Sequence, residues 1–460
     1  MVEMISVLVA GATLLYLLVE VVVRTPQLGL LLVGLVAVVS WHVPVWPSVA
    51  SFAGLSFAVP DFLTVVLIAS TLVYVLGRAQ PKIDRNLKLA IDGLIVLLVV
   101  SVLKGIVQVG LASSLNESRA WIYIISISAW TVVFLKSDPN AIVWLRKGVL
   151  VTAAGITMVA LLNVALNGFG GASTSSVSAS GVVLEAGRPI SSGQAMILAI
   201  AAILCIWCWS RLGNRSYFIG FLGFTVVVVL AQHRSVWIAL AIGVVLSLLF
   251  LLKGQAAAVV GALVLIIGTA LVSLVIFSDS RIAAILFESA ADSRTYDGRV
   301  YDWQILIGAS FDSGLHTVLT GFPFGSGWTR YREDGLRIGY IPHNWYVATY
   351  LRAGAFGLLF MVFVGAVLIQ RGWKNRFTTP ALAIAAMLVA YCWSYNLQWY
   401  LAPALGWLVW SMSRPNVVEK QCEMTGQSEN AETLLTTVSE VSRAFGERHS
   451  VPHWKRYKLQ

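Results

Sequence analysis

Long apolar stretches separated by short polar connections run along almost the whole chain of 460 residues. Crossing the hydrocarbon core of a membrane as an α-helix takes about 20 apolar residues. Stretches of this kind predict twelve or thirteen membrane helices, depending on how the first pair and the last pair are divided. They lie at about 5–23, 28–44, 60–77, 89–110, 119–135, 149–167, 192–210, 216–232, 235–252, 256–277, 344–369, 380–396 and 399–413. The pattern therefore predicts an all-α polytopic membrane protein.

One interruption of this pattern is long and polar. Residues 278–343 are too long for a plain connector and too charged to span a membrane, so they predict one large loop that carries part of a site. Residues 1–277 then hold the first ten membrane helices, and residues 344–413 hold the C-terminal ones. Residues 414–460 are polar and mixed in charge, which predicts a disordered tail.

Local patterns inside the connections predict some structure. Ala290–Ser310 has a mixed helical pattern that favours a helix lying on the membrane surface. Gly321–Trp328 is a cluster of glycine, proline and aromatic residues that predicts a turn. The connection at 168–191 is rich in small residues, so it could be a plain connector or a mobile flap over a site.

The charge distribution predicts which connections lie on which side of the membrane. Charged residues make up 12% of the chain, against about a quarter in a soluble domain. The net charge of +10 arises because basic residues gather in alternate connections, and the positive-inside rule makes those connections cytoplasmic. We therefore expect a cytoplasmic C-terminus, and an outside N-terminus if all thirteen spans are present. The extracytoplasmic connections are then 45–59, 111–118, 168–191, 232–234 and 278–343.

The same distribution limits localisation and partners. A basic charge sorted by topology does not indicate a nucleic-acid partner, and none is expected. The alanine- and valine-rich composition is typical of a bacterial protein, so we expect the bacterial cytoplasmic membrane. A site in the long insert would then lie on the extracytoplasmic face.

The long insert is rich in arginine and contains no lysine. Its arginines are Arg281, Arg294, Arg299, Arg330, Arg332 and Arg337. Guanidinium binds phosphate and carboxylate groups in a fixed two-pronged geometry that an ammonium group cannot match. The insert therefore predicts that the protein handles a phosphate or a carboxylate.

Three residues at the ends of predicted helices are candidates for this site. Arg234 lies in a short turn between two apolar stretches, Arg299 lies in the insert, and His343 lies where the next helix begins. Ionisable groups at membrane depth are costly, so their placement is informative. Histidine is the side chain most easily poised as a base near neutral pH.

Each candidate also has an ordinary structural explanation. Arg234 could be a turn arginine whose guanidinium reaches lipid headgroups. Arg299 could form an ion pair with Asp297 or Asp302. His343 could simply be a polar residue at a helix start.

Three further residues stay outside the expected site. His233 and His316 are weaker candidates, because neither has a comparable place in a turn before a long helix. Arg352 follows His343 by nine residues, which on a helix is the opposite face.

The sequence contains no pattern for a metal or a nucleotide. The insert has no D-x-D motif, and no histidine lies close to Asp297 or Asp302 at ligand spacing. A phosphate-binding P-loop is missing as well. Cys205 and Cys208 form a C-x-x-C inside a predicted membrane helix, where we interpret them as small buried hydrophobes. We expect neither a metal nor a cofactor.

The order of several short motifs resembles the O-antigen ligase and O-antigen polymerase family. The motifs are H-R-S-V-W from His233, G-R-x-x-x-W from Gly298, G-x-P-x-G-x-G from Gly321, H-N-x-Y from His343 and G-x-x-G from Gly354. They cover about residues 185–370, and their order around one large loop carries the resemblance. His233 beside Arg234 departs from the family pattern.

The resemblance implies a function and a role for each site residue. Members of this family are membrane glycosyltransferases of cell-envelope polysaccharide biosynthesis. They transfer a glycan from an undecaprenyl diphosphate carrier to an acceptor outside the cytoplasmic membrane, and they need no metal. Arg234 and Arg299 match the arginines that hold the donor diphosphate, and His343 matches the histidine that takes a proton from the acceptor hydroxyl. Arg188 lies where family members often have a polar residue before a helix, and it joins the donor-binding set.

Elementary chemistry supports the same set of residue types. A lipid diphosphate is already an activated leaving group, so no nucleotide site is needed. Aimed arginines stabilise the negative charge that develops as the sugar–oxygen bond breaks. A poised histidine typically contributes about 10²–10⁴-fold by taking a proton.

Two other classes of function remain open at this stage. A transporter or flippase for lipid-linked glycans would have charged groups near the membrane midplane and broken helices at matching places in two halves. A non-catalytic scaffold of a glycan-assembling machine would survive loss of Arg234, Arg299 and His343. Within the enzyme class, the residues do not separate a polymerase, whose acceptor is another lipid-linked glycan, from a ligase.

Overall fold

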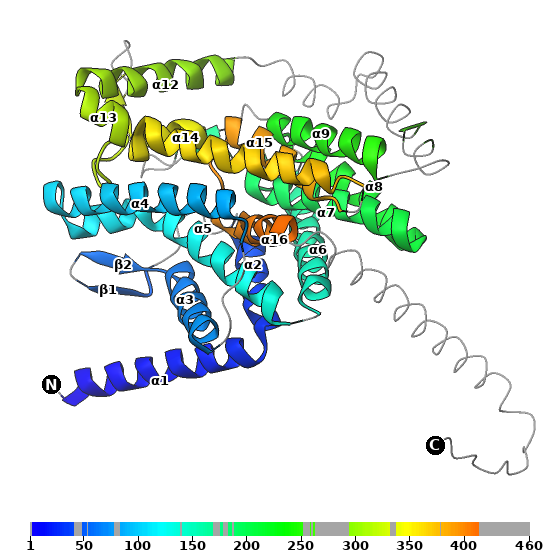
Figure 1. Cartoon of the computed structure of the whole chain (residues 1–460), viewed down its shortest axis with the longest axis horizontal. Helices are drawn as coiled ribbons and strands as arrows, with labels where there is room; N and C mark the ends of the chain where they lie inside the picture. Colours follow the sequence, from blue (N-terminus) through cyan, green and yellow to red (C-terminus); the bar gives the residue numbers. More distant parts are fainter. Residues whose placement is uncertain are drawn as a thin grey trace, which may run out of the picture.

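The structure is a computed structural model, and it is almost entirely helical (Figure 1). It describes residues 2–40, 48–52, 54–77, 83–138, 140–168, 175–177, 183–185, 188–251, 258, 261–262, 294–331, 337–377 and 379–413. The predicted span at 256–277 and the predicted tail at 414–460 lie outside this set, apart from residues 258, 261 and 262. So do residues 278–293, the first part of the long insert.

Helices occupy nearly every stretch that hydrophobicity predicts to span a membrane. The first group is α1 (Val2–Arg24), α2 (Pro26–Val39), α3 (Val59–Gly77), α4 (Arg85–Gln108), α5 (Leu111–Ser137) and α6 (Ala141–Asn167). The second group is α7 (Ser192–Leu212), α8 (Arg215–Leu230), α9 (Arg234–Phe250), α14 (Trp345–Lys374), α15 (Ala381–Ser394) and α16 (Ala402–Ser413), with a short 3₁₀ helix η1 (Trp399–Leu401). The predicted class, an all-α polytopic membrane protein, is confirmed at this level.

The described part of the chain contains fewer helices of membrane-spanning length than the hydrophobic pattern predicts. Among the described residues, six helices are long and apolar enough to cross a membrane: α3, α4, α5, α6, α7 and α14. The first two helices meet at an angle of 110° between Thr13–Arg24 and Pro26–Val39, which makes them a bent pair and a candidate seventh span. Helix α15 has 14 residues and α16 has 12, or roughly 21 and 18 Å, against a hydrocarbon core of about 30 Å. Twelve or thirteen spans therefore stay a prediction.

Helix α7 forms the centre of the bundle. Every residue from Gly193 to Cys208 is buried, because α6, α8, α9 and α15 all pack against it. An apolar helix that is covered on all sides is typical of a membrane-protein core. Cys205 and Cys208 are buried free thiols within it, as expected from the sequence.

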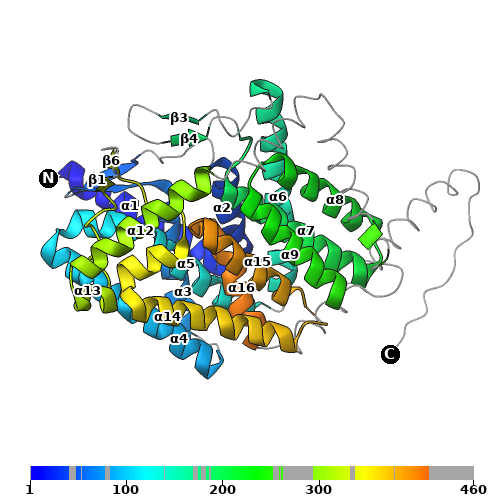
Figure 2. The ribbon, with the colours of Figure 1, turned by 90° about the horizontal axis from the view of Figure 1, so that it is seen from above.

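The part of the long insert that the structure describes is folded. It consists of α12 (Arg294–Asp312), α13 (Leu315–Thr320) and a hairpin of β5 (Arg330–Tyr331) and β6 (Arg337–Ile338). The helix predicted over Ala290–Ser310 is confirmed from Arg294 onwards. Helices α12 and α13 lie against the beginning of α14, and Figure 2 shows α12 crossing above that end of the bundle.

A buried ion pair ties the hairpin to α12. The Arg330 guanidinium lies 3.1 Å from the Asp302 carboxylate, and both side chains are almost fully buried. Arg330 also donates to the carbonyl oxygens of Trp328 and Tyr340, at 3.1 and 3.0 Å. Asp302, which the sequence offered as a partner for Arg299, is therefore held by a different arginine.

Two further hairpins lie in predicted extracytoplasmic connections. β1 (Ala50–Phe52) pairs with β2 (Leu55–Phe57), with Ala50 opposite Phe57. β3 (Ser175–Val177) pairs with β4 (Val183–Glu185) within the connection rich in small residues. Both pairs are antiparallel.

The glycine-proline turn after α13 is fastened to three helices. Phe322 donates its backbone N–H to the Leu351 carbonyl in α14 at 2.7 Å. The Ser101 hydroxyl in α4 donates to the Phe322 carbonyl at 2.9 Å. The backbone carbonyl of Ser101 accepts from the Phe324 N–H at 3.2 Å. Ser114 of α5 donates to the Phe324 carbonyl at 3.0 Å. The G-x-P-x-G-x-G motif is thus a docked structural element.

Arg352 and Glu117 form an ion pair, and both hydrogen-bond to the backbone of this turn. One Glu117 oxygen accepts from Arg352 Nε at 2.5 Å, and the other accepts from the backbone N–H groups of Gly325 and Gly327 at 2.7 and 3.2 Å. Arg352 donates to the Gly327 carbonyl at 2.6 Å and lies 3.8 Å from the ring centre of Trp328. This network makes Arg352 a structural residue, in agreement with its exclusion from the expected site.

Gly354 allows the bend in α14 that lets the helix contact α13. It has φ +67° and ψ −168° inside an otherwise helical segment, a backbone conformation essentially restricted to glycine. A Cβ there would lie 2.2 Å from the carbonyl carbon of Leu319. The close approach of two backbones explains the glycine.

We expect Gly354→Ala to destabilise the protein by at least about 2 kcal/mol, because strained backbone alone costs roughly 1–3 kcal/mol and the clash adds to it. Thermal unfolding of the purified protein in detergent measures this. Gly308→Ala in α12 is the control: a Cβ there meets no atom within 4 Å, so a gain of up to about 1 kcal/mol is expected. A melting temperature of Gly354→Ala equal to that of the unsubstituted protein would contradict the assignment.

Residues of the predicted extracytoplasmic connections contact one another or the adjoining helix ends. Arg119, which directly follows the connection 111–118, donates to the Ser56 carbonyl in β2. Ser114 of that connection donates to the Phe324 carbonyl of the insert at 3.0 Å, and Arg188 lies beside His233. These connections therefore gather at one end of the bundle.

Residues of the predicted cytoplasmic connections also gather, at the other ends of the same helices. Arg371 at the end of α14 pairs with Asp84, which caps α4. Arg211 donates to the Phe377 carbonyl at 2.9 Å, and Gln27 donates to Asp138 at 3.4 Å. The contacts agree with the predicted alternation, while the side that faces the cytoplasm stays a prediction. Helices α4 and α14, which reach from one end to the other, lie side by side in both views (Figures 1 and 2).

Candidate functional site

Two of the predicted site residues, Arg299 and His343, contact the side chain of Tyr395. Tyr395 follows the last residue of α15 and has extended backbone, with φ −142° and ψ 155°, so the chain leaves the helix there. Its side chain is buried. His233, Arg299 and His343, from three different segments, all contact it.

Arg299 lies against the end of α15. Its guanidinium carbon is 5.2 Å from the ring centre of Tyr395, a cation–π contact, and Nη1 donates to the Ser394 carbonyl at 3.2 Å. The last carbonyls of a helix have no partner within the helix and carry its negative dipole end. A guanidinium is therefore favoured at this place, and Arg299 fastens α12 over the end of α15.

His343 lies in the loop directly before α14. Its ring contacts Tyr395 edge-on at 6.4 Å between ring centres and Tyr340 at 5.5 Å. The residue that caps α14 is Asn344, whose side chain accepts from the N–H groups of Tyr346 and Val347 at 2.9 and 3.0 Å. His343 thus precedes the cap rather than opening the helix, which corrects the expected position by one residue, and it is half-buried.

His233 belongs to this site, although the sequence ranked it as weak. It occupies the turn between α8 and α9 and is 1% exposed. Nε2 lies 2.9 Å from the Ile190 carbonyl oxygen, while Nδ1 lies 3.3 Å from the Tyr395 hydroxyl and 3.4 Å from Arg188 Nη1. A carbonyl oxygen only accepts, so Nε2 carries the proton and Nδ1 of the neutral ring accepts.

Arg188 is positioned by the start of α7. Ser191 and Gln194 form a reciprocal capping box there, which fixes the direction in which the chain enters the helix. Gln194 is fully buried and donates to the carbonyl oxygens of Ala37 and Val38 in α2, at 2.8 and 3.0 Å. These bonds anchor the segment that carries Arg188 and Ile190.

Arg234 is the first residue of α9, directly after His233, and is half-buried. The turn before it contains Gln232, which is fully buried and has φ +60°, an uncommon conformation for a residue with a side chain. Strained backbone is often retained at functional sites. This turn places Arg234 directly after the buried His233 at the start of α9.

The other ionisable residues of the insert lie outside this cluster. His316 is exposed on α13, Arg337 is exposed on β6, and Arg330 is buried against Asp302. Arg281 and Arg332 lie outside the described residues, and the side chain of Arg294 does as well. Arg299 and His343 thus contact Tyr395 directly, and Arg188 is linked to it through His233.

The chemistry available at this cluster is anion binding and proton transfer. Arg188, Arg234 and Arg299 can donate charge-assisted hydrogen bonds to phosphate oxygens, and His343 can take up a proton. Within the described part of the chain, no three histidine, cysteine or acidic side chains come together as metal ligands. The cluster is suited to a substrate that brings its own negative charge.

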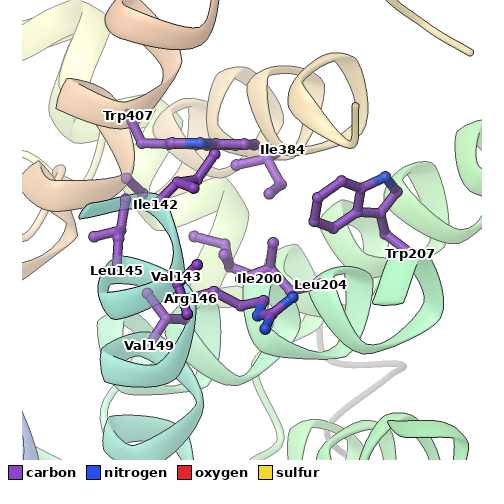
Figure 3. A pocket seen from close by; sticks show the side chains of 11 residues that line it. Ile142, Val143, Leu145, Arg146, Val149, Ile200, Leu204, Trp207, Ile384 and Trp407 are labelled. Atoms are coloured by element: carbon purple, nitrogen blue, oxygen red, sulfur yellow. The ribbon is translucent and has the colours of Figure 1, made fainter. Parts of the chain in front are cut away.

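A separate cavity lies at the opposite end of α15, away from the cluster (Figure 3). Its walls are almost entirely aliphatic and aromatic, with the Arg146 guanidinium reaching into the space below Trp207. The lining residues are Ile142, Val143, Leu145, Arg146, Val149, Ile200, Leu204, Trp207, Ile384, Ala404 and Trp407. Arg146 is buried and lies 3.9 Å from Cys208 Sγ. The cavity shares no residue with the Tyr395 cluster.

Neither the known protein families nor the curated proteins contain a match to this chain.

Proposed function

We propose that this protein is a membrane glycosyltransferase that uses a glycan linked to undecaprenyl diphosphate as its donor. The observation that carries the proposal is the convergence of Arg299, His343 and the Arg188–His233 pair on Tyr395. Of these residues, the sequence and its resemblance indicate Arg188 and Arg299 for diphosphate binding and His343 for proton transfer. They come from the segments before α7 and α14 and from α12, and such a convergence favours a site over separate structural roles.

The arginines act at the donor. Arg188, Arg234 and Arg299 hold the diphosphate and stabilise the charge on its terminal oxygen as the bond to the sugar breaks. A buried guanidinium contributes more than an exposed one, because little water screens it. The lipid chain stays in the membrane beside the bundle, and the diphosphate reaches the extracytoplasmic end where the cluster is proposed to lie.

His343 acts at the acceptor. An acceptor hydroxyl attacks the anomeric carbon, its proton passes to the imidazole, and the bonding electrons leave with the diphosphate oxygen. A single displacement of this kind inverts the anomeric centre. The acceptor is another lipid-linked glycan in a polymerase, or a lipid, protein or wall polymer in a ligase, and the same three steps serve both. No nucleotide, metal or other cofactor takes part in this scheme.

Arg299→Ala is expected to abolish formation of long or attached glycan in cells whose own copy of the gene has been removed, because it removes a charge from the donor site. Arg299→Lys is expected to restore only a small part, since an ammonium group lacks the two-pronged geometry. Arg188→Ala and Arg234→Ala are measured beside it. Surface glycan and polymer length are read on gels, with the protein level checked by immunoblot.

The matched control is Arg337→Ala, which removes an exposed arginine of the same insert and is expected to leave glycan unchanged. Normal glycan in all three site variants, at a normal protein level, would remove the catalytic assignment. A transporter or a scaffold would then be favoured.

A further inference from the structure

His233 is the residue of the cluster to which the proposed chemistry gives no task. It is buried, and it departs from the family pattern that the rest of the site resembles. Its contacts with Arg188, Tyr395 and the Ile190 carbonyl link two residues of the site to the backbone before α7. Their geometry gives His233 a specific role.

The Ile190 carbonyl fixes the tautomer. Because Nε2 donates to that oxygen at 2.9 Å, the neutral ring presents only an acceptor at Nδ1. Both groups that face Nδ1, the Arg188 guanidinium and the Tyr395 hydroxyl, are donors. The ring therefore satisfies three partners in one orientation, and the second nitrogen of a histidine is commonly set in this way by its neighbour.

The bond to Arg188 fixes where that charge lies. Arginine side chains have many rotamers, and holding one of them in place costs entropy that must otherwise be lost when a ligand binds. His233 holds the guanidinium before the donor arrives. A hydrogen bond that involves a charged group contributes more than a neutral one, which makes this contact suited to the task.

The bond to Tyr395 fixes the other half of the cluster. The hydroxyl that donates to Nδ1 sets the rotation of the Tyr395 side chain, and its ring carries Arg299 on one face and meets His343 at an edge. The orientation of the imidazole thereby affects the positions of Arg299 and His343 through the Tyr395 ring.

We infer that His233 is a positioning residue, which, as a neutral ring with its proton on Nε2, holds Arg188 and Tyr395 in the arrangement that receives a lipid diphosphate. This role rests on the proposed function for the identity of the ligand. In this role His233 orders the side chains of the donor site before the donor binds, without contacting the donor itself.

Two substitutions separate the nitrogens of the ring. The amide of asparagine reaches the position of Nδ1, so His233→Asn keeps an acceptor for Arg188 and Tyr395 and loses the bond to Ile190. The amide of glutamine reaches the position of Nε2, so His233→Gln keeps the bond to Ile190 and loses the acceptor. Both variants place one amide in the same buried turn, and each serves as the control for the other.

The first measurement is the affinity of the full-length protein in nanodiscs for undecaprenyl diphosphate. His233→Gln is expected to raise the Kd about ten- to a hundredfold, the range for loss of a hydrogen bond to a charged group. His233→Asn is expected to stay within about threefold of the unsubstituted protein, since its acceptor remains. Equal affinities for the two variants would overturn the inference and leave the proposed function standing.

The second measurement reads the hydrogen bonds without any ligand. Nitrogen NMR of protein labelled with ¹⁵N-histidine gives one signal pair that disappears in both His233 variants. The expected pattern is a neutral ring protonated at Nε2; a ring protonated at Nδ1, or at both nitrogens near neutral pH, overturns the inference. If the unsubstituted protein binds no undecaprenyl diphosphate, the proposed function fails, and this spectrum alone then decides whether His233 holds Arg188 and Tyr395.

Discussion

Replacement of His343 by alanine is expected to lower glycan transfer by about 10²–10⁴-fold, the usual contribution of a general base. The physical reason is that an acceptor hydroxyl holds its proton tightly near neutral pH, and His343 is the imidazole proposed to take that proton up. His233 is engaged through both nitrogens. The rate of donor consumption by purified protein measures the loss.

The fold is expected to survive this change. Asn344, and not His343, caps α14, so the helix start keeps its hydrogen bonds. The matched control is His316→Ala, which removes an exposed histidine of the same insert and should leave the rate unchanged. A rate for His343→Ala within threefold of the unsubstituted protein would exclude a role as base.

Arg352→Met is expected to cause a large loss of stability, because its ion pair with Glu117 is buried. Removing one partner of a buried ion pair typically costs about 3–5 kcal/mol, because the other charge stays buried without compensation. Glu117 keeps its bonds to the N–H groups of Gly325 and Gly327, but it loses the guanidinium. The change in melting temperature in detergent, with the urea midpoint as a second probe, measures the effect.

A second arginine of the same helix provides the control. Arg371 pairs with Asp84 near the end of α14, where its side chain is 34% exposed against 2% for Arg352. Pairs with solvent access contribute about 0–1 kcal/mol, so Arg371→Met should hardly change the melting temperature. Similar losses for the two variants would show that burial does not set the contribution of the Arg352 pair.

Donor binding by Arg352→Met separates a loss of stability from a loss of function. Arg352 fixes the turn that joins α13 to the β5–β6 hairpin, and it lies outside the Tyr395 cluster. Because it lies outside the cluster, we expect the fraction of this variant that remains folded to bind undecaprenyl diphosphate normally.

Much of the helical architecture could be predicted from hydrophobicity, because apolar stretches of about 20 residues have few alternatives in a membrane. The predicted stretches at 380–396 and 399–413 lie close to α15 (Ala381–Ser394) and α16 (Ala402–Ser413). Hydrophobicity alone does not reveal that the backbone becomes extended at Tyr395. The bend between α1 and α2 is also hidden, although Pro26 at the first position of α2 is a signal for a new helix start.

The site could be predicted in part. Arg299 and His343 were found because a charged residue and a histidine are rare near membrane helices and therefore conspicuous. Tyr395 was missed because a tyrosine in an aromatic-rich C-terminal stretch looks like any other core residue. Its role arises only when α9, α12 and α14 meet at the end of α15, which is a tertiary property.

The ranking of His233 shows how a single-residue argument can go wrong. His233 was a weak candidate because its place in the sequence is not comparable with that of His343, which lies in a turn before a long helix. The better signal was the polarity of Gln232 and His233 in a turn of three residues between two apolar helices. Polar side chains that a short turn cannot expose must find partners inside the protein.

The most direct test of the central claim uses the purified protein in nanodiscs and an undecaprenyl-diphosphate-linked glycan isolated from cells that make this protein. Release of undecaprenyl diphosphate is followed over time with the unsubstituted protein, His343→Ala and Arg299→Ala. The account predicts release by the unsubstituted protein and a loss of at least about a hundredfold in both variants. A donor that stays intact with the unsubstituted protein, or crosses the bilayer of a proteoliposome without losing its glycan, would contradict it.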